Sequence, residues 1–213
     1  MRLQDVLEES RSRAAAVITE RIESAPTSPL ATASPAEIDA TACALGYGGV
    51  KYFDLHQNRL QDYVFNYDRM LSADGDTATY LQYARARLSS ILRKAEAAGA
   101  PSVAALRSVA LDDSVAIAAA WIWEHASEAL LAAYLLRFGE VVAGIQEDLM
   151  PHRMCEFMYG LAGKATDFIR DCSVLGETTR PALRDSRLRL VITTVDTLTT
   201  CMRLLGIEPL DRI

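Results

Sequence analysis

Hydrophobic residues recur every three to four positions along most of the chain, which is the spacing of one face of an α-helix. The clearest stretch is residues 77–98, where one stripe contains Leu81, Ala84, Leu88, Ile91, Leu92 and Ala95. Similar spacing predicts further helices over residues 3–24, after Pro35, in two or three segments of 113–148 broken near Phe138, after Pro151, and over 181–205. The pattern therefore predicts an all-α fold, built as a helical bundle.

Proline and glycine interrupt this pattern at definite places. Pro26, Pro29 and Pro35 follow the first helical stretch, and proline both removes a backbone donor and restricts the residue before it. We therefore expect residues 1–24 to form the N-terminal helix of the same domain, 25–35 a proline-rich linker, and 36–213 the helical domain itself. The helix that begins after Pro35 is expected to stop at the glycines within residues 45–49.

Composition limits the classes of protein that this chain can belong to. Its 213 residues are 50% hydrophobic and carry a net charge of −6. A chain of this length can bury a core without disulfides or a structural metal. Its acidity argues against coating nucleic acid or an anionic membrane through bulk charge, although a local basic face stays open. We expect no DNA or membrane partner. Four cysteines in apolar surroundings and an N-terminus without an apolar leader indicate reduced thiols and a cytoplasmic location.

The sequence contains no recognisable catalytic or metal-binding motif. The histidines, His56, His125 and His152, lie outside any HExxH or zinc-type arrangement. A nucleophile elbow (GxSxG) and a phosphate-binding loop (GxxxxGKS) are both absent. We therefore predict no catalytic residue, no metal and no cofactor in these 213 residues.

One face of the helix predicted over residues 77–98 has more chemical character. A glycine-containing turn leads into this helix, and either Asp76 or Thr77 is suited to cap it. Helical spacing then places two phenols and two cations on one face, with a serine between the cations: Tyr80, Tyr83, Arg87, Ser90 and Lys94. Aromatic rings and arginine stack on unpaired bases, so this face is suited to single-stranded loop RNA. The alternative is that the tyrosines border the core and the cations are merely solvated.

Six stretches in order along the chain closely resemble the C-terminal part of arginyl-tRNA synthetase, the helical anticodon-binding domain of a class I enzyme. They are residues 48–55 (GGVKYFDL), 57–59 (QNR), 62–72 (DYVFNYDRMLS), 80–87 (YLQYARAR), 147–163 (EDLMPHRMCEFMYGLAG) and 204–212 (LLGIEPLDR). The resemblance covers nearly the whole chain. It implies a helical domain that binds the anticodon loop of tRNA(Arg), through the positions that correspond to Asp74, Gly75, Tyr80, Tyr83, Arg87, Arg212 and Ile213. Lys94 joins this set from its place on the same helical face.

The resemblance also implies what is missing. In that family a Rossmann-type catalytic domain carries the His-Ile-Gly-His and Lys-Met-Ser-Lys-Ser motifs that bind ATP and activate arginine, and neither motif occurs in these residues. We therefore expect that the isolated chain does not aminoacylate tRNA and that it serves a separate catalytic partner.

Two other interpretations stay open. The sequence has Ala73 where the family usually has an aromatic residue, Thr79 where proline is frequent, and Ile213 where methionine is usual. These changes also fit a helical protein-interaction subunit derived from the synthetase that has lost RNA recognition. The remaining interpretation is a fragment of a complete arginine-tRNA ligase.

Overall fold

The computed structural model describes residues 2–24, 30–108 and 120–213, and in these ranges every regular element is a helix. The all-α prediction is therefore confirmed for the described residues. The helices are α1 (Leu3–Ser24), α2 (Pro35–Leu55), α3 (Tyr67–Leu71), α4 (Ala78–Ala97), α5 (Val103–Arg107), α7 (Ala126–Leu136), α8 (Phe138–Asp148), α9 (His152–Asp171) and α10 (Pro181–Leu204).

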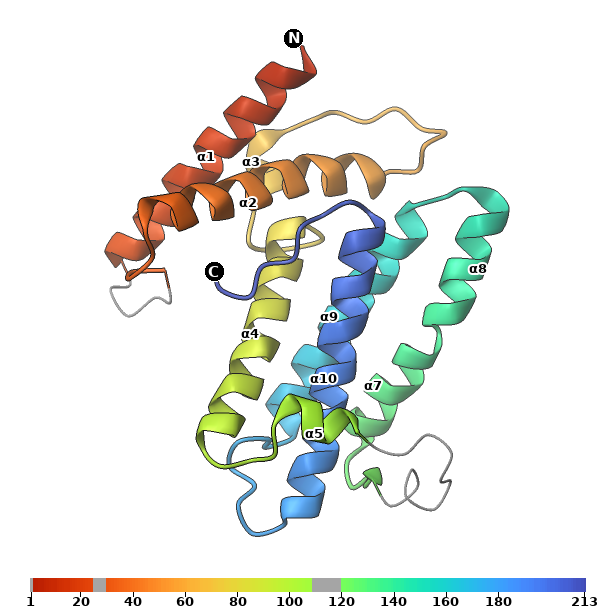
Figure 1. The fold of residues 1–213 in the computed structure, drawn as a ribbon. Helices are drawn as coiled ribbons and strands as arrows, with labels where there is room; N and C mark the ends of the chain where they lie inside the picture. Colours follow the sequence, from red (N-terminus) through yellow and green to blue (C-terminus); the bar gives the residue numbers. More distant parts are fainter. Residues whose placement is uncertain (1, 25–29, 109–119) are drawn as a thin grey trace.

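The long helices form a bundle with a crossed pair at one end. α4, α7, α9 and α10 run side by side, while α1 and α2 lie across their upper end in Figure 1. After α10 the chain turns back over α4, so the C-terminus lies beside the crossed pair. α4 is thus the helix on which the bundle, the crossed pair and the C-terminal segment meet.

Two separate groups of buried apolar side chains hold this arrangement together. The larger core lies within the bundle, and its fully buried members include Leu81, Leu131, Met158, Leu161, Leu188 and Leu198. The smaller core joins α1 and α2 to α4 and consists of Ala14, Ile18, Leu30, Ala42, Leu45, Ala86 and Ile213. Burial of apolar surface is the main favourable term in folding, so this smaller core holds α1 and α2 to the bundle, and Tyr52 of α2 adds a contact with the larger core.

The predicted end of the second helix was wrong. α2 continues through Gly46, Gly48 and Gly49 as far as Leu55. A Cβ atom at Gly46 would lie 2.7 Å from the backbone nitrogen of Arg11 in α1. Glycine is therefore needed where the two helices cross in close contact, and that packing outweighs its low helix propensity.

Several other helix limits agree with the pattern, but residues 121–125, within the predicted helical stretch of 113–148, are not helical, and α7 begins only at Ala126. Thr77 caps α4 by accepting a hydrogen bond from the backbone N–H of Tyr80 at 3.1 Å. α7 and α8 adjoin at Arg137, next to the predicted break, and α9 begins directly after Pro151. Residues 25–29 of the predicted linker and residues 113–119 of the predicted helical segments lie outside the described residues.

Three of the four cysteines have the predicted environment. Cys155, Cys172 and Cys201 are buried and unpaired, whereas Cys43 is only partly buried. Within residues 2–24, 30–108 and 120–213, no helix combines the length and apolar composition needed to cross a bilayer.

Two glycine substitutions should distinguish the effect of helix propensity on stability from the effect of the close crossing of α1 and α2. Gly46→Ala should lower the free energy of unfolding by about 1–3 kcal/mol, because the added methyl group forces α1 and α2 apart. Gly163→Ala, in α9, should raise it by about 0.5–1 kcal/mol, because a Cβ there meets no atom within 4 Å. Urea unfolding of both variants checks this, and equal effects of the same sign would contradict the close-crossing explanation.

Candidate functional site

An exposed turn precedes α4 and carries two of the predicted site residues. Asp74 and Gly75 are exposed, and Gly75 has a φ of 86°, in the left-handed region that favours glycine. The Thr77 hydroxyl donates to the Ser72 carbonyl at 2.7 Å, which closes the turn. The turn therefore presents its backbone to solvent in a fixed shape.

A buried tyrosine anchors the end of this turn. The hydroxyl of Tyr52, which is 1% exposed, donates to the Asp76 carboxylate at 2.5 Å and lies 3.2 Å from the Cys155 carbonyl oxygen. Burial raises the pKa of the Asp76 carboxyl above its ordinary value, and the hydrogen bond from Tyr52 only partly opposes this. Through these contacts, the position of the turn depends on both α2 and α9.

A shallow groove begins at the first turn of α4 and runs between α4 and α9. Its first part is a pocket of about 200 Å³ lined by Tyr80, Tyr83, Ala84, Arg87, Leu88, Ala162, Ala165, Thr166 and Ile169. Its second part, about 420 Å³, shares Arg87 and Ile169 and extends past Ser90 and Lys94 to residues 172–176. The structure therefore brings Tyr80, Arg87 and Lys94 to one continuous groove, as the helical spacing predicts.

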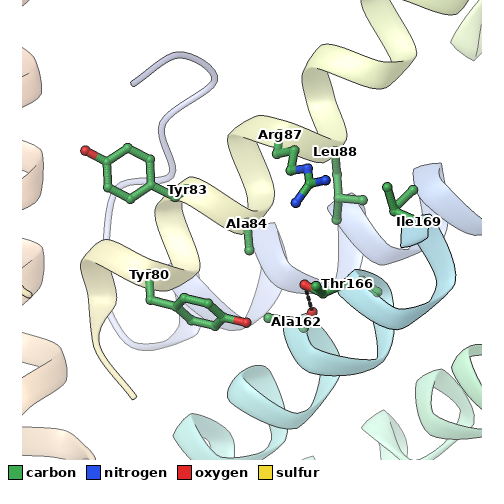
Figure 2. Close-up of a pocket in the computed structure, with 9 residues that line it drawn as sticks. Tyr80, Tyr83, Ala84, Arg87, Leu88, Ala162, Thr166 and Ile169 are labelled. Carbon is green, nitrogen blue, oxygen red and sulfur yellow. Dashed lines mark hydrogen bonds between the residues drawn. The ribbon is translucent and has the colours of Figure 1, made fainter. Parts of the chain in front are cut away.

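The two tyrosines point in different directions. In Figure 2 the Tyr80 ring lies beneath α4 and points toward Ala162, whereas the Tyr83 ring points away from α9. Tyr80 packs edge-on against Tyr159, with ring centroids 5.5 Å apart, and belongs to the border of the larger core. Tyr83 borders the smaller core instead, and the Arg21 guanidinium of α1 lies 4.2 Å from its ring centroid. Tyr83 thus contributes to the pocket rim, but its ring is directed toward α1.

The cations of the groove have no carboxylate partner in the part of the chain that the structure describes. Arg87 and Lys94 are exposed, and neither forms an ion pair with a described residue. In Figure 2 the Arg87 guanidinium extends from α4 toward Thr166 and Ile169. Both positive charges are therefore available to an anion that enters the groove.

Two buried polar residues of α4 hold the C-terminal segment. Gln82 donates to the Glu208 carbonyl at 2.6 Å and accepts from the Leu210 N–H at 2.9 Å. Arg85, which is 7% exposed, donates to the Leu210 carbonyl at 2.8 Å. It also donates to the Thr199 hydroxyl at 2.7 Å. Spacing along the sequence does not identify these residues, because their partners lie more than a hundred positions away.

The two predicted C-terminal site residues lie apart from the groove. Ile213 is 7% exposed and packs in the smaller core, so its side chain faces the protein interior. Arg212 is exposed and borders a hollow between α2 and the C-terminal segment. The structure therefore brings Tyr80, Arg87 and Lys94 to the groove, whereas Asp74 and Gly75 lie in the turn before α4 and Arg212 and Ile213 lie elsewhere.

Comparison with protein families divides the chain into two matched parts. The family described as "DALR anticodon binding domain" matches residues 81–213, and the family described as "tRNA synthetases class I (R), catalytic domain" matches residues 1–67. The groove residues from Tyr83 to Lys94 and the C-terminal segment lie in the first part. α1 and α2 lie in the second.

Individual relatives match over the whole chain. An arginine–tRNA ligase of Nostoc sp. is 38% identical over 214 residues, which are 100% of this chain and 34% of the ligase. One of Enterobacter sp. is 36% identical over 213 residues, which are 100% of this chain and 33% of the ligase. The chain thus spans about a third of the length of these relatives.

Solved structures of arginyl-tRNA synthetases also match over the whole chain. The arginyl-tRNA synthetase of Plasmodium falciparum superposes with a TM-score of 0.79 at 29% identity, covering 100% of this chain and 34% of that one. The enzyme of Thermus thermophilus superposes with a TM-score of 0.78 at 28% identity, covering 100% and 32%. The helical architecture is therefore shared with these proteins.

Asp76→Asn should remove a pH dependence of stability. The pKa of Asp76 in the folded protein lies above the ordinary value of 3.8. The folded state therefore binds the proton more tightly, so wild-type stability falls as pH rises through the raised pKa. Asparagine keeps an acceptor for Tyr52 and does not ionise.

The free energy of unfolding of Asp76→Asn, relative to wild type, should therefore rise from acid to neutral pH and then level off. Urea titrations across this range measure it, with the exposed Asp74→Asn as control. A difference that stays flat with pH would refute the burial argument.

Arg85→Ala should release the C-terminal segment. It removes the donor to three acceptors, the Leu210 carbonyl, the Thr199 hydroxyl and the Asp211 carboxylate, and should lower the free energy of unfolding by about 1–3 kcal/mol. It should also make residues 208–213 easier to remove with a carboxypeptidase. Arg87→Ala, two positions along α4 but exposed, is the matched control and should change neither measurement appreciably. Equal behaviour of the two variants would disprove the role of Arg85.

Proposed function

The chain belongs to the DALR anticodon binding domain family, and on that premise we propose that it binds the anticodon loop of an arginine tRNA and does not aminoacylate it alone. The observation that carries this proposal is the groove beside α4, which contains the Tyr80 ring and two cations, Arg87 and Lys94, that form no ion pair with a described residue. The exposed turn at Asp74 and Gly75 leads directly into this helix. Aromatic rings and cations are the groups that bind the bases and phosphates of a single-stranded loop.

The chemistry of the groove fits unpaired RNA better than a duplex. Loop bases are free to stack on aromatic rings and guanidinium groups, and the phosphates that join them attract unpaired cations. The turn is exposed at Gly75, where the absence of a side chain lets a base approach the backbone closely. The net charge of −6 is compatible with this, because only a narrow face needs to be positive.

The positions where the sequence departs from the family pattern do not remove this face. Thr79 is 4% exposed, so it contributes to packing beneath the turn and does not reach a ligand. Ile213 is also buried, and it acts through the smaller core. Only Ala73 is exposed, where it offers a methyl group in place of a ring. We infer that RNA binding is retained and that fewer bases are stacked at the turn, which argues against the interaction-subunit alternative.

Catalysis requires residues beyond those of this chain. The chain spans about a third of the length of the arginine–tRNA ligases that it matches. We propose that the ATP and arginine sites are supplied by a class I catalytic domain, either in a separate polypeptide or in a longer form of the same one. Residues 1–67, which include α1 and α2, match the catalytic-domain family, and this match supports the proposal that the chain works with the rest of such a domain.

The double variant Arg87→Ala/Lys94→Ala should weaken binding to a tRNA transcript with an arginine anticodon by about tenfold or more. Each lost phosphate contact should also make the plot of log affinity against log salt shallower by about 0.7. Fluorescence anisotropy at several salt concentrations measures both effects, with a transcript of altered anticodon as the specificity comparison.

Arg137→Ala/Arg153→Ala is the matched control. It removes the same charge from the α8 side, where Arg153 pairs with Asp148 at 2.6 Å. It should leave affinity and salt dependence near the wild-type values. Wild-type affinity in the groove variant, or no binding at low salt, would overturn the proposal.

A further inference from the structure

A cation from α1 lies on the aromatic ring of Tyr83. The guanidinium carbon of Arg21 is 4.2 Å from the centroid of that ring, within the range of a cation–π contact. Arg21 lies in the part of the chain that matches the catalytic-domain family, and Tyr83 lies in the part that matches the DALR family. The pair therefore bridges the two matched parts directly beside the groove.

The guanidinium of Arg21 has no other described partner. Arg21 is exposed, and among the described residues its side chain forms no ion pair. The comparison with Arg13, on the same helix, is informative. Arg13 lies 4.7 Å from the Tyr67 ring centroid, but it is also bound to Glu9 at 2.6 Å and to Asp68 at 3.0 Å. Among the described residues of α1, only Arg21 therefore lies on an aromatic ring without also forming an ion pair.

The contact changes what Tyr83 can do. One face of its ring is covered by Arg21, and the ring points away from the α4–α9 groove (Figure 2). A base cannot stack on the covered face. The ring instead supports the guanidinium, while Arg21 as a whole stays exposed to solvent. A supported guanidinium plane stacks on unpaired bases, and its edge donates to phosphate.

We propose that Arg21 is an RNA-binding residue that stacks on an unpaired base, and that Tyr83 is the positioning residue that holds it. This inference rests on the proposed function and extends the RNA-binding surface from α4 onto α1. A loop bound in the α4–α9 groove then continues over the first turns of α4 toward the crossed helices. Recognition of RNA thereby uses both matched parts of the chain at once.

Binding of an anticodon-arm RNA hairpin with an arginine anticodon tests this proposal. Arg21→Ala should raise the dissociation constant about tenfold, and Tyr83→Leu should have a similar effect, because stacking on one base accounts for this size of change. Tyr83→Phe keeps the ring and should bind like wild type. Arg21→Lys keeps the charge but loses the planar group, and should recover only part of the affinity.

The double variant Arg21→Ala/Tyr83→Leu should bind no more weakly than either single variant, because the two residues act as one unit. Arg137→Ala is the matched control, since Arg137 lies 5.0 Å from the Tyr134 ring centroid at the α7–α8 junction, away from α1 and α4. Its affinity should equal that of wild type.

Fluorescence of 2-aminopurine placed in turn at each loop position separates stacking from a purely structural effect. One position should be quenched on binding to wild type and to Tyr83→Phe, but less so with Arg21→Ala and Arg21→Lys. Thermal unfolding midpoints of the variants, measured in parallel, identify loss of folding.

The two proposals fail in different ways. If Arg87→Ala/Lys94→Ala weakens binding while Arg21→Ala and its fluorescence signal match wild type, the role of Arg21 is wrong and the proposed function stands. If wild type does not bind the hairpin or the full transcript at low salt, both proposals fail. Additive effects of Arg21→Ala and Tyr83→Leu would overturn the positioning role of Tyr83.

Discussion

Burial of α4 on two sides is the constraint on which the rest of the structure depends. Leu81 and Leu88 pack into the larger core, while Ala86 packs into the smaller core with α1, α2 and the C-terminal residue. Buried polar groups must find partners, and Gln82 and Arg85 find theirs in the C-terminal segment. Only a narrow part of the helix remains exposed, and that part carries the candidate RNA-binding groups.

This arrangement explains how an acidic protein can present a cationic surface. Many arginines are committed to carboxylates, including Arg187, whose Nε lies 2.6 Å from the Glu128 carboxylate in the interior. Three exposed cations on or beside α4 are different, because Arg21, Arg87 and Lys94 form no ion pair with a described residue, unlike the buried Arg85, which pairs with Asp211. Unpaired charges attract an anion more strongly than paired ones, so local pairing matters more here than net charge.

Much of the fold could be predicted from local pattern. Apolar spacing identified the long helices, and capping residues such as Thr77 and Pro151 placed their starts to within a residue or two. The prediction failed at the glycines of α2, where local preference and tertiary packing conflict. Gly46 reads as a helix terminator in sequence, but in the structure it allows α1 and α2 to cross.

The candidate site, like the fold, could be predicted from the sequence only where it depends on local helical geometry. Groups on one helix, such as Tyr80, Arg87 and Lys94, are related by helical geometry, so the sequence by itself determined that they share one face of α4, and the packing of α9 decided that this face borders a groove. It could not determine that Tyr83 turns toward α1 or that Ile213 is buried. Those outcomes depend on which distant segment packs against α4, and close packing of whole helices is decided only when the chain folds.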